Sequence, residues 1–392
     1  MKSKEEIVLQ EVERCKKDFI YFAEKYLRIL DKDEKLSPLV FNTAQSRLHR
    51  KLEEGEGFIK ILKARQLGSS TYIAARFFWE ALFNPNTRVA VIAHSDAGVK
   101  NIFNIYQRFY TNLPKWLQIK QVKDSASQIE FITGSLIKVG TANSENFRGS
   151  TYSRIHASEA AFWSDMSSTI QSLFQTASNN PTIIVETTPN GLNEFYTFWK
   201  ENNGYYPLFL SWLDHDEYKL KKLPKDGDKP TQMEMEFGKE HKLEDDQLNW
   251  FIRTLRTRCS NNLNTFKTEY PATEQEAFIA TGAFVFPQFS HLAGNKPTNR
   301  GWQIYKTPGK YNTYTMGIDV ASGSPNGDYT AITILDITNK DQIEIVATFY
   351  DKVTSKELVE IVKRTLTKWE GLVCAERNNY GLILIEIGRA HV

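Results

Sequence analysis

The feature that most constrains the fold is a regular alternation of apolar, strand-like runs with helical patterns between residues 58 and 213. The strand-like runs are FIKIL (58–62), RVAVIAH (88–94), SRIHAS (153–158), PTIIVET (181–187) and YPLFLSW (206–212). Between them lie helical patterns such as TYIAARFFWEALF (71–83) and AGVKNIFNIYQRFY (97–110). A helical crossover returns the chain to the same end of a sheet, so strands joined in this way run parallel. The alternation therefore predicts an α/β domain with a mainly parallel sheet and helices on both faces.

Two further patterns set the domain organisation. The segments QIEFI and LIKVG, joined by TGS within 128–140, alternate with period two around a glycine turn and predict an antiparallel hairpin. A new pattern of strands and one amphipathic helix begins at Tyr314, after a polar stretch rich in Gly, Pro and Asn. The predicted segments are an N-terminal helical segment (1–40), an α/β domain (41–289), a linker (290–312), a partial second α/β domain (313–386) and a non-native tail (387–392) that follows a truncation.

Composition excludes several classes of protein. The net charge of +2 means that any nucleic-acid surface has to be a local patch. The three cysteines show no paired spacing, which argues against a disulfide framework or a zinc site. No stretch approaches the ~18 consecutive apolar residues of a membrane span, and the charged N-terminus lacks the apolar core of a signal peptide. We therefore expect a protein of a reducing cytoplasm that is neither secreted nor bound to a membrane.

The segment KARQLGSST (63–71) lies where a phosphate-binding loop belongs, between a strand-like run and a helical pattern. The usual motif is G-x-x-x-x-G-K-[ST], in which backbone N–H groups and a lysine hold phosphates and a hydroxyl reaches magnesium. Gly68 and Ser70 fill two of these positions, but Ser69 replaces the lysine. Lys63 stands at the first glycine and Arg65 follows, which indicates a cation moved to the start of the loop. The alternative is an ordinary strand–turn–helix junction.

Polar side chains also follow two later strand-like runs. Glu159 comes directly after RIHAS and has the character of a general base for in-line attack by water. Ser158 stands where an aspartate that helps to hold magnesium is usual. Thr187 ends PTIIVET and Thr188 follows it, and in open α/β sheets ligands bind at the carboxyl ends of strands. We expect these threonines to sense the γ-phosphate, the alternative being a plain Pro-Asn-Gly turn.

Two more residues are candidates on weaker grounds. Arg148, in the glycine-containing segment NFRGST, suits stabilisation of transition-state charge, in its own subunit or in a neighbour. Gln45 precedes a helical pattern, and its amide suits the reading of an adenine edge because it donates and accepts at once. The alternative for both is an ordinary surface or helix-start position.

The second domain carries three acidic candidates. Asp319 ends the run YTMGID, Asp328 opens the next run, and Glu376 follows LVCA. Carboxylates at the ends of adjacent strands can hold pairs of Mg²⁺ or Mn²⁺ ions, which activate water for phosphodiester cleavage. The sequence therefore predicts a metal-dependent nuclease site, the alternative being turn and edge acids with capping roles.

Taken in order, these motifs resemble one family, the large terminase subunit of tailed bacteriophages, an ATP-driven motor that packages DNA. The resemblance spans about residues 35 to 385. The segments that carry it are FNTAQ (41–45), KARQLGSST, FRGS (147–150), IHASEAAFW (155–163), TTPNGLNEFYTFW (187–199), YPATEQEAF (270–278), GIDVASGSPNGDYTAI (317–332) and CAERNNYG (374–381).

The resemblance implies a P-loop ATPase domain followed by a truncated ribonuclease H-like nuclease domain. It points to Lys63, Arg65 and Ser70 at the phosphates and to Glu159 as the catalytic carboxylate. It makes Thr187 and Thr188 the segment that couples hydrolysis to movement. It also implies Arg148 as a finger that reaches a neighbour's ATP, and Asp319 and Glu376 as metal ligands with Asp328 as a third.

The implied cofactors are ATP and Mg²⁺, with Mn²⁺ possible at the nuclease site. The implied partners are double-stranded DNA, the portal protein of the procapsid, the small terminase subunit and further copies of the chain in a ring. The family has another nuclease Asp further along the chain, so we expect the parent protein to cut DNA but this chain to be nuclease-deficient or poorly folded in its second domain. Candidates for gripping DNA are four lysines, unless they form only a solvated face: Lys219, Lys221, Lys222 and Lys225.

Two other functions fit part of the pattern. A helicase-like remodelling ATPase uses the first domain alone and gives Asp319 and Glu376 no role. A degenerate nucleotide-binding assembly module is consistent with the moved lysine and with Ser158 in place of an aspartate.

Overall fold

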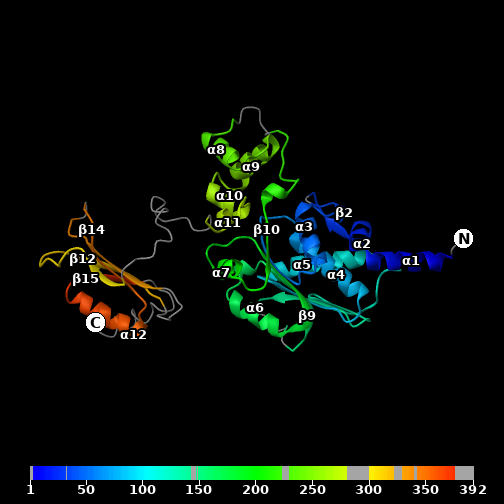
Figure 1. Cartoon of the computed structure of the whole chain (residues 1–392), viewed down its shortest axis with the longest axis horizontal. Coiled ribbons are helices and arrows are strands. Elements are labelled where there is room, and N and C mark those ends of the chain that lie inside the picture. Colours follow the sequence, from blue (N-terminus) through cyan, green and yellow to red (C-terminus); the bar gives the residue numbers. More distant parts are fainter. Residues whose placement is uncertain are drawn as a thin grey trace. The chain divides into compact units, whose positions relative to one another are not determined.

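The computed structural model describes residues 3–31, 33–142, 147, 149–222, 229–279, 300–321, 329–339 and 342–375. They belong to two compact units, the first within residues 1–285 and the second within residues 286–392 (Figure 1).

The first unit is built on an eight-stranded sheet. In spatial order its strands are β10 (Tyr206–Leu210), β3 (Phe58–Lys63), β9 (Ala177–Thr187), β8 (Tyr152–Ser158), β4 (Arg88–Ala93), β7 (Leu136–Thr141), β6 (Gln128–Phe131) and β5 (Gln121–Ser125). The strands from β10 to β7 all pair in parallel, while β6 and β5 are antiparallel additions. The predicted mainly parallel α/β sheet is confirmed, and the predicted hairpin is the β6–β7 pair.

Helices cover both faces of this sheet (Figure 1). On one side lie α3 (Thr43–Glu53), α4 (Ser69–Phe83) and α5 (Asp96–Asn112), and on the other lie α6 (Met166–Gln175) and α7 (Glu194–Lys200). Along β4, Val89 and Val91 enter the first core, whereas Ala90 and Ile92 enter the second. Because both faces are buried, the strands read as continuous apolar runs rather than as alternating ones.

The N-terminal segment joins the first of these cores. It contains α1 (Lys4–Lys17), α2 (Phe19–Tyr26), β1 (Arg28–Leu30) and β2 (Leu36–Pro38). Asp18 separates the two helices, and its side chain accepts from the backbone N–H of Tyr21 as the N-cap of α2. Phe19 then packs edge-on against Tyr72 of α4, with ring centroids 5.9 Å apart. The N-terminal segment therefore packs against α4, the helix that follows the loop at 64–68.

Several helices follow β10, and Trp212 packs against two of them. The helices are the short helix η3 (Trp212–Asp214), α8 (Gln232–Glu240), α9 (Asp245–Arg258), α10 (Leu263–Glu269) and α11 (Glu274–Ile279). The ring of Trp212 stacks on Trp250 of α9 at 5.0 Å and meets Phe266 of α10 edge-on at 5.7 Å. None of the helices that the structure describes has the length and apolar character of a membrane span.

The second unit contains a five-stranded mixed sheet. Its order is β11 (Gly301–Ile304), β14 (Glu344–Asp351), β13 (Thr330–Asp336), β12 (Tyr314–Asp319) and β15 (Gly371–Ala375). Only β12 and β15 pair in parallel, because α12 (Ser355–Leu366) lies between β14 and β15 in the chain. Strand β11 lies within the stretch predicted as a linker, so residues from Gly301 on already belong to the second sheet.

Candidate functional site

Three neighbouring strands of the first unit bring their carboxyl ends together. Strand β9 lies between β3 and β8, and all three run parallel. Leu62 pairs with Thr187, and Ser158 pairs with Glu186. The residues at the ends of these strands are far apart in the sequence. They therefore come together only in the folded sheet, at one of its edges.

The loop between β3 and α4 is shaped by left-handed backbone. Gln66 has a φ of 55° and Gly68 a φ of 73°. The positive φ favours glycine at position 68, and a Cβ atom there would lie 2.7 Å from Nε2 of Gln45, so a larger residue would also displace the Gln45 side chain. The helix α4 then begins at Ser69, and its first N–H groups face the loop.

Two side chains at the N-terminus of α3 donate hydrogen bonds to carbonyl groups of this loop. Gln45 Nε2 donates to the carbonyl of Gly68 at 2.9 Å, and Asn42 Nδ2 donates to the carbonyl of Leu67 at 3.0 Å. Gln45 Oε1 accepts from the backbone N–H of Asn42 at 3.1 Å in a capping box. Both ends of the Gln45 amide are thus bonded within the chain, and its predicted contact with adenine stays a prediction.

Lys63 lies at the centre of the site. Its Nζ is 2.8 Å from Oε1 of Glu159 and 3.7 Å from Oε2 of Glu186, and only 7% of the side chain is exposed. Burial alone lowers the pKa of an amine, but the charges of Glu186 and Glu159 outweigh it and raise the pKa of Lys63. The ammonium is therefore charged and paired with two carboxylates.

Glu159 is held by groups from both sides. It has a φ of 53° and precedes the short helix η2 (Ala160–Phe162). Its Oε2 accepts from the N–H and from Oγ1 of Thr188, each at 3.0 Å, and from Oγ1 of Thr187 at 3.4 Å. Burial raises the pKa of Glu159, but Lys63 and the hydrogen bonds lower it by more. The pKa of this carboxyl is therefore below its usual value. The site thus contains an ionised carboxylate with 24% of its side chain exposed to water.

Glu186 is the site residue that sequence reasoning missed. Its side chain is fully buried, and it accepts from Oγ of Ser69 at 2.8 Å, from Oγ of Ser70 and from Nε2 of His156 at 2.9 Å. Burial raises its pKa, but Lys63 and these donors outweigh burial and hold the pKa well below its usual range. The available signal was an acidic letter inside the apolar run IIVET.

The second basic residue of the loop points elsewhere. Arg65 has 60% of its side chain exposed, and its Nε lies 2.7 Å from Oε2 of Glu269 at the end of α10. Its backbone N–H also donates to the carbonyl of Glu269. Of the two cations predicted at the phosphates, only Lys63 joins the cluster at the strand ends. The other predicted arginine, Arg148, lies outside the described residues.

The predicted nuclease residues are only partly described. Asp319 is the last residue of β12 and is exposed, while Asp328 and Glu376 lie outside the described residues. Within the part of the chain that the structure describes, no three His, Cys, Asp or Glu side chains are grouped to hold a metal ion by themselves.

The four lysines predicted to grip DNA are only partly described, and that role stays a prediction. Lys219 pairs with Glu244 at 3.0 Å and with Asp246 at 4.0 Å. Lys221 and Lys222 are exposed, and Lys225 lies outside the described residues.

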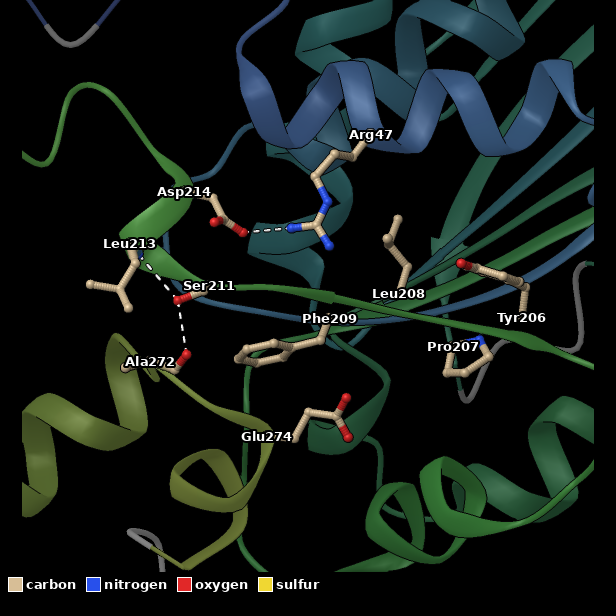
Figure 2. A pocket seen from close by; sticks show the side chains of 10 residues that line it. All are labelled: Arg47, Tyr206, Pro207, Leu208, Phe209, Ser211, Leu213, Asp214, Ala272 and Glu274. Carbon is tan, nitrogen blue, oxygen red and sulfur yellow. Dashed lines mark hydrogen bonds and ion pairs between the residues drawn. The ribbon is translucent and has the colours of Figure 1, made fainter. Parts of the chain in front are cut away.

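A pocket of about 450 Å³ opens along the edge strand β10 (Figure 2). Arg47 of α3 reaches down to Asp214 at its rim, with Nη1 2.5 Å from Oδ2, and Glu274 lies at the opposite side below Phe209. None of the residues that line it was predicted as a site residue; they are Arg47, Tyr206, Pro207, Leu208, Phe209, Ser211, Leu213, Asp214, Ala272 and Glu274. The pocket is therefore distinct from the Lys63 cluster.

Comparison with known proteins identifies the family. A family model described as the N-terminal part of the terminase large subunit, of the T4-like virus type, matches residues 60–258, which is half of the chain. The chain belongs to the terminase large subunit family. The matched residues include the loop, Glu159 and the strand that carries Glu186, so the cluster lies within the family's common region.

Two solved structures illustrate the likeness. The large terminase of bacteriophage HK97 has a TM-score of 0.56 and 13% sequence identity, covering 95% of this chain and 83% of that one. At this identity the comparison shows a shared fold. The large terminase of the thermophilic bacteriophage D6E, in complex with ADP, has a TM-score of 0.40 and 10% identity, covering 90% and 80% of the two chains.

The contacts predict unequal effects of removing the two cations of the loop. Lys63→Met leaves two buried carboxylates without their cation and is expected to lower the free energy of unfolding by about 3–5 kcal/mol. The matched control, Arg65→Met, removes an exposed ion pair and is expected to cost about 0–1 kcal/mol. Urea unfolding followed by tryptophan fluorescence measures both, and equal losses in the two variants would contradict the burial of Lys63.

The lowered carboxylate pKa values predict a loss of stability in acid. A group whose pKa is lower in the folded chain stabilises it fully above its unfolded value, which is 4.5 for glutamate. That contribution is lost as the pH falls through the folded-state pKa values. The free energy of unfolding is therefore expected to begin to fall below about pH 5 and to go on falling toward the lowered folded-state pKa values, less steeply in Glu186→Gln. Parallel pH curves for the two proteins would show that Glu186 does not carry the effect.

Proposed function

We propose that this terminase large subunit binds and hydrolyses ATP at the Lys63 cluster and uses the energy to drive double-stranded DNA into a viral procapsid. The observation that carries the proposal is the position of the Lys63 ammonium. It lies 2.8 Å from Oε1 of Glu159, a carboxylate that suits a catalytic base, and 3.7 Å from Oε2 of Glu186, which accepts from Ser69 at the start of α4. Family membership supplies the packaging context.

Phosphate binding follows from the loop and the helix behind it. The first N–H groups of α4, a helix of 15 residues, have no partner within the helix and carry its positive dipole end, which favours an anion. Lys63 adds a full positive charge from the strand side of the loop. Its flexible side chain takes the role of the lysine that Ser69 replaces in the sequence.

Hydrolysis needs Glu159 to be ionised and free. In the structure Oε1 of Glu159 accepts from the ammonium of Lys63. While this pair is intact, Glu159 is not free to act as a base and Lys63 is not free to bind a phosphate. Phosphates of a bound nucleotide compete with Glu159 for Lys63, because both are anions. Once Lys63 turns to the phosphates, Glu159 is available to accept a proton from the attacking water.

The loop also fits a magnesium ion by the chemistry of its donors. Ser70 supplies a hydroxyl oxygen and the strand ends supply carboxylate oxygens, which Mg²⁺ prefers. Mg²⁺ is usually held by one or two carboxylates together with substrate phosphates, so a cage made only of protein groups is not needed. When bound, the ion neutralises charge on the phosphate oxygens.

The segment after β9 is suited to transmit the change to the rest of the domain. Thr187 and Thr188 hold Oε2 of Glu159, so movement of that carboxylate alters their contacts. Further along, Asn190 and Asn193 both donate to the carbonyl of Ala161, at 2.9 and 2.7 Å. Asn193 also caps α7, which gives a continuous path from Glu159 to a surface helix.

For the second unit we propose metal-dependent cleavage of DNA by Asp319, Asp328 and Glu376 with Mg²⁺ or Mn²⁺. Support comes from the parallel pairing of Ile318 with Ala375, the residues that precede Asp319 and Glu376 in the sequence.

The proposed partners are the portal protein, the small terminase subunit and further copies of the chain in a ring, where Arg148 reaches a neighbour's ATP. The proposed location is the host cytoplasm.

The assignment of Glu159 predicts a separation of binding from turnover. Glu159→Gln keeps the shape of the side chain but removes the base, so ATP hydrolysis is expected to fall by about 10²–10⁴-fold while ATP binding is retained. Steady-state phosphate release and isothermal titration calorimetry measure the two properties.

A matched control is Glu130→Gln, on the antiparallel strand β6, which is expected to leave hydrolysis unchanged. Unchanged turnover in Glu159→Gln would remove Glu159 from the catalytic role, and a wild-type chain that binds no ATP would overturn the proposed function.

A further inference from the structure

Strand β8 ends without the carboxylate that a magnesium–nucleotide site needs. In P-loop ATPases the ion is held by the serine or threonine of the loop and by an aspartate at the end of a strand. Here that strand end is Ser158, and a hydroxyl is a weaker partner for Mg²⁺ than a carboxylate. Either the site lacks this charge or another residue supplies it.

The neighbouring strand carries a carboxylate at the same level. Ser158 of β8 and Glu186 of β9 are direct partners in the parallel pairing. Their side chains converge, with Oγ of Ser158 3.3 Å from Oε1 of Glu186. A glutamate is one methylene longer than an aspartate, which suits a reach across from the adjacent strand.

Glu186 also makes the contacts with the loop that this role requires. Both serines at the start of α4 donate to it, Ser69 to Oε2 and Ser70 to Oε1. Ser70 is the hydroxyl that the loop motif directs to magnesium. The carboxylate is therefore already bonded to the group with which it would share the ion.

A purely structural role explains the site less completely. A buried carboxylate is costly even when paired, and a well-packed apolar residue at this position in β9 would avoid that cost. His156, fully buried on β8, donates from Nε2 to Oε1 and so fixes the orientation of the Glu186 carboxylate. Lys63 and these donors keep it ionised, which is the form that binds a metal.

We propose that Glu186 replaces the missing β8 carboxylate and holds, with Ser70, the magnesium ion of bound ATP. This assignment rests on the proposed ATPase function and adds the metal-associated residue to it. Compared with the usual P-loop arrangement, the carboxylate lies on β9 instead of β8, and it still contacts the serines that follow the loop.

The test compares ATP affinity with and without magnesium, measured by calorimetry on the full chain in Mg²⁺ and in EDTA. Wild-type protein is expected to bind ATP more tightly in Mg²⁺. Glu186→Gln is expected to lose about 10–100-fold of that gain, while its affinity in EDTA changes much less. Ser158→Ala, which removes the other candidate, is expected to keep the gain, as is the distant control Glu130→Gln.

A relocation variant guards against misfolding of Glu186→Gln. The double substitution S158D/E186T returns the carboxylate to β8 and is expected to restore the magnesium gain. Retention of the full gain by Glu186→Gln, its loss in Ser158→Ala, or failure of the relocation in a protein with a wild-type thermal melt would each overturn the inference. If wild-type protein binds no ATP in either condition, the proposed function fails first and the inference fails with it.

Discussion

One buried ammonium group organises the first unit of this protein. The Nζ atom of Lys63 lies between the carboxylates of Glu159 and Glu186 at the point where β3, β8 and β9 end. Charges removed from water are costly unless they are paired and hydrogen-bonded. Two carboxylates against one ammonium leave a local excess of negative charge, and the remaining oxygen positions are filled by donors from the loop and from neighbouring strands.

On the proposed function, the cluster exchanges one set of partners for another. In the structure Lys63 is paired with Glu159, and the two serines of the loop donate to Glu186. A bound nucleotide brings phosphates that attract the ammonium and a cation that attracts the carboxylate. We propose that both exchanges use groups already within hydrogen-bonding distance, and that binding of the nucleotide in this way rearranges the contacts of Glu159 with the threonines that hold it.

Much of this arrangement was accessible from the sequence. Strands buried on both faces leave unbroken apolar runs, which is why the parallel strands were predicted, and polar letters at their ends marked the site. Glu186 was missed because a charged letter inside such a run was read only as part of a strand. The register that sets it beside Ser158 depends on pairing between segments far apart in the chain. The sequence alone does not distinguish Lys63 from Arg65, because the distinction depends on contacts with distant residues. Lys63 meets Glu159 and Glu186, whereas Arg65 is paired with Glu269.

We propose that Lys63 replaces the lysine absent after Gly68 as the cation at the phosphates. A crystal structure of the chain with a non-hydrolysable ATP analogue and magnesium tests this most directly. Nζ of Lys63 is expected to leave Glu159 and to lie about 3 Å from a phosphate oxygen, with Arg65 still paired to Glu269. A structure in which Arg65 contacts the phosphates while Lys63 remains on Glu159 would contradict it.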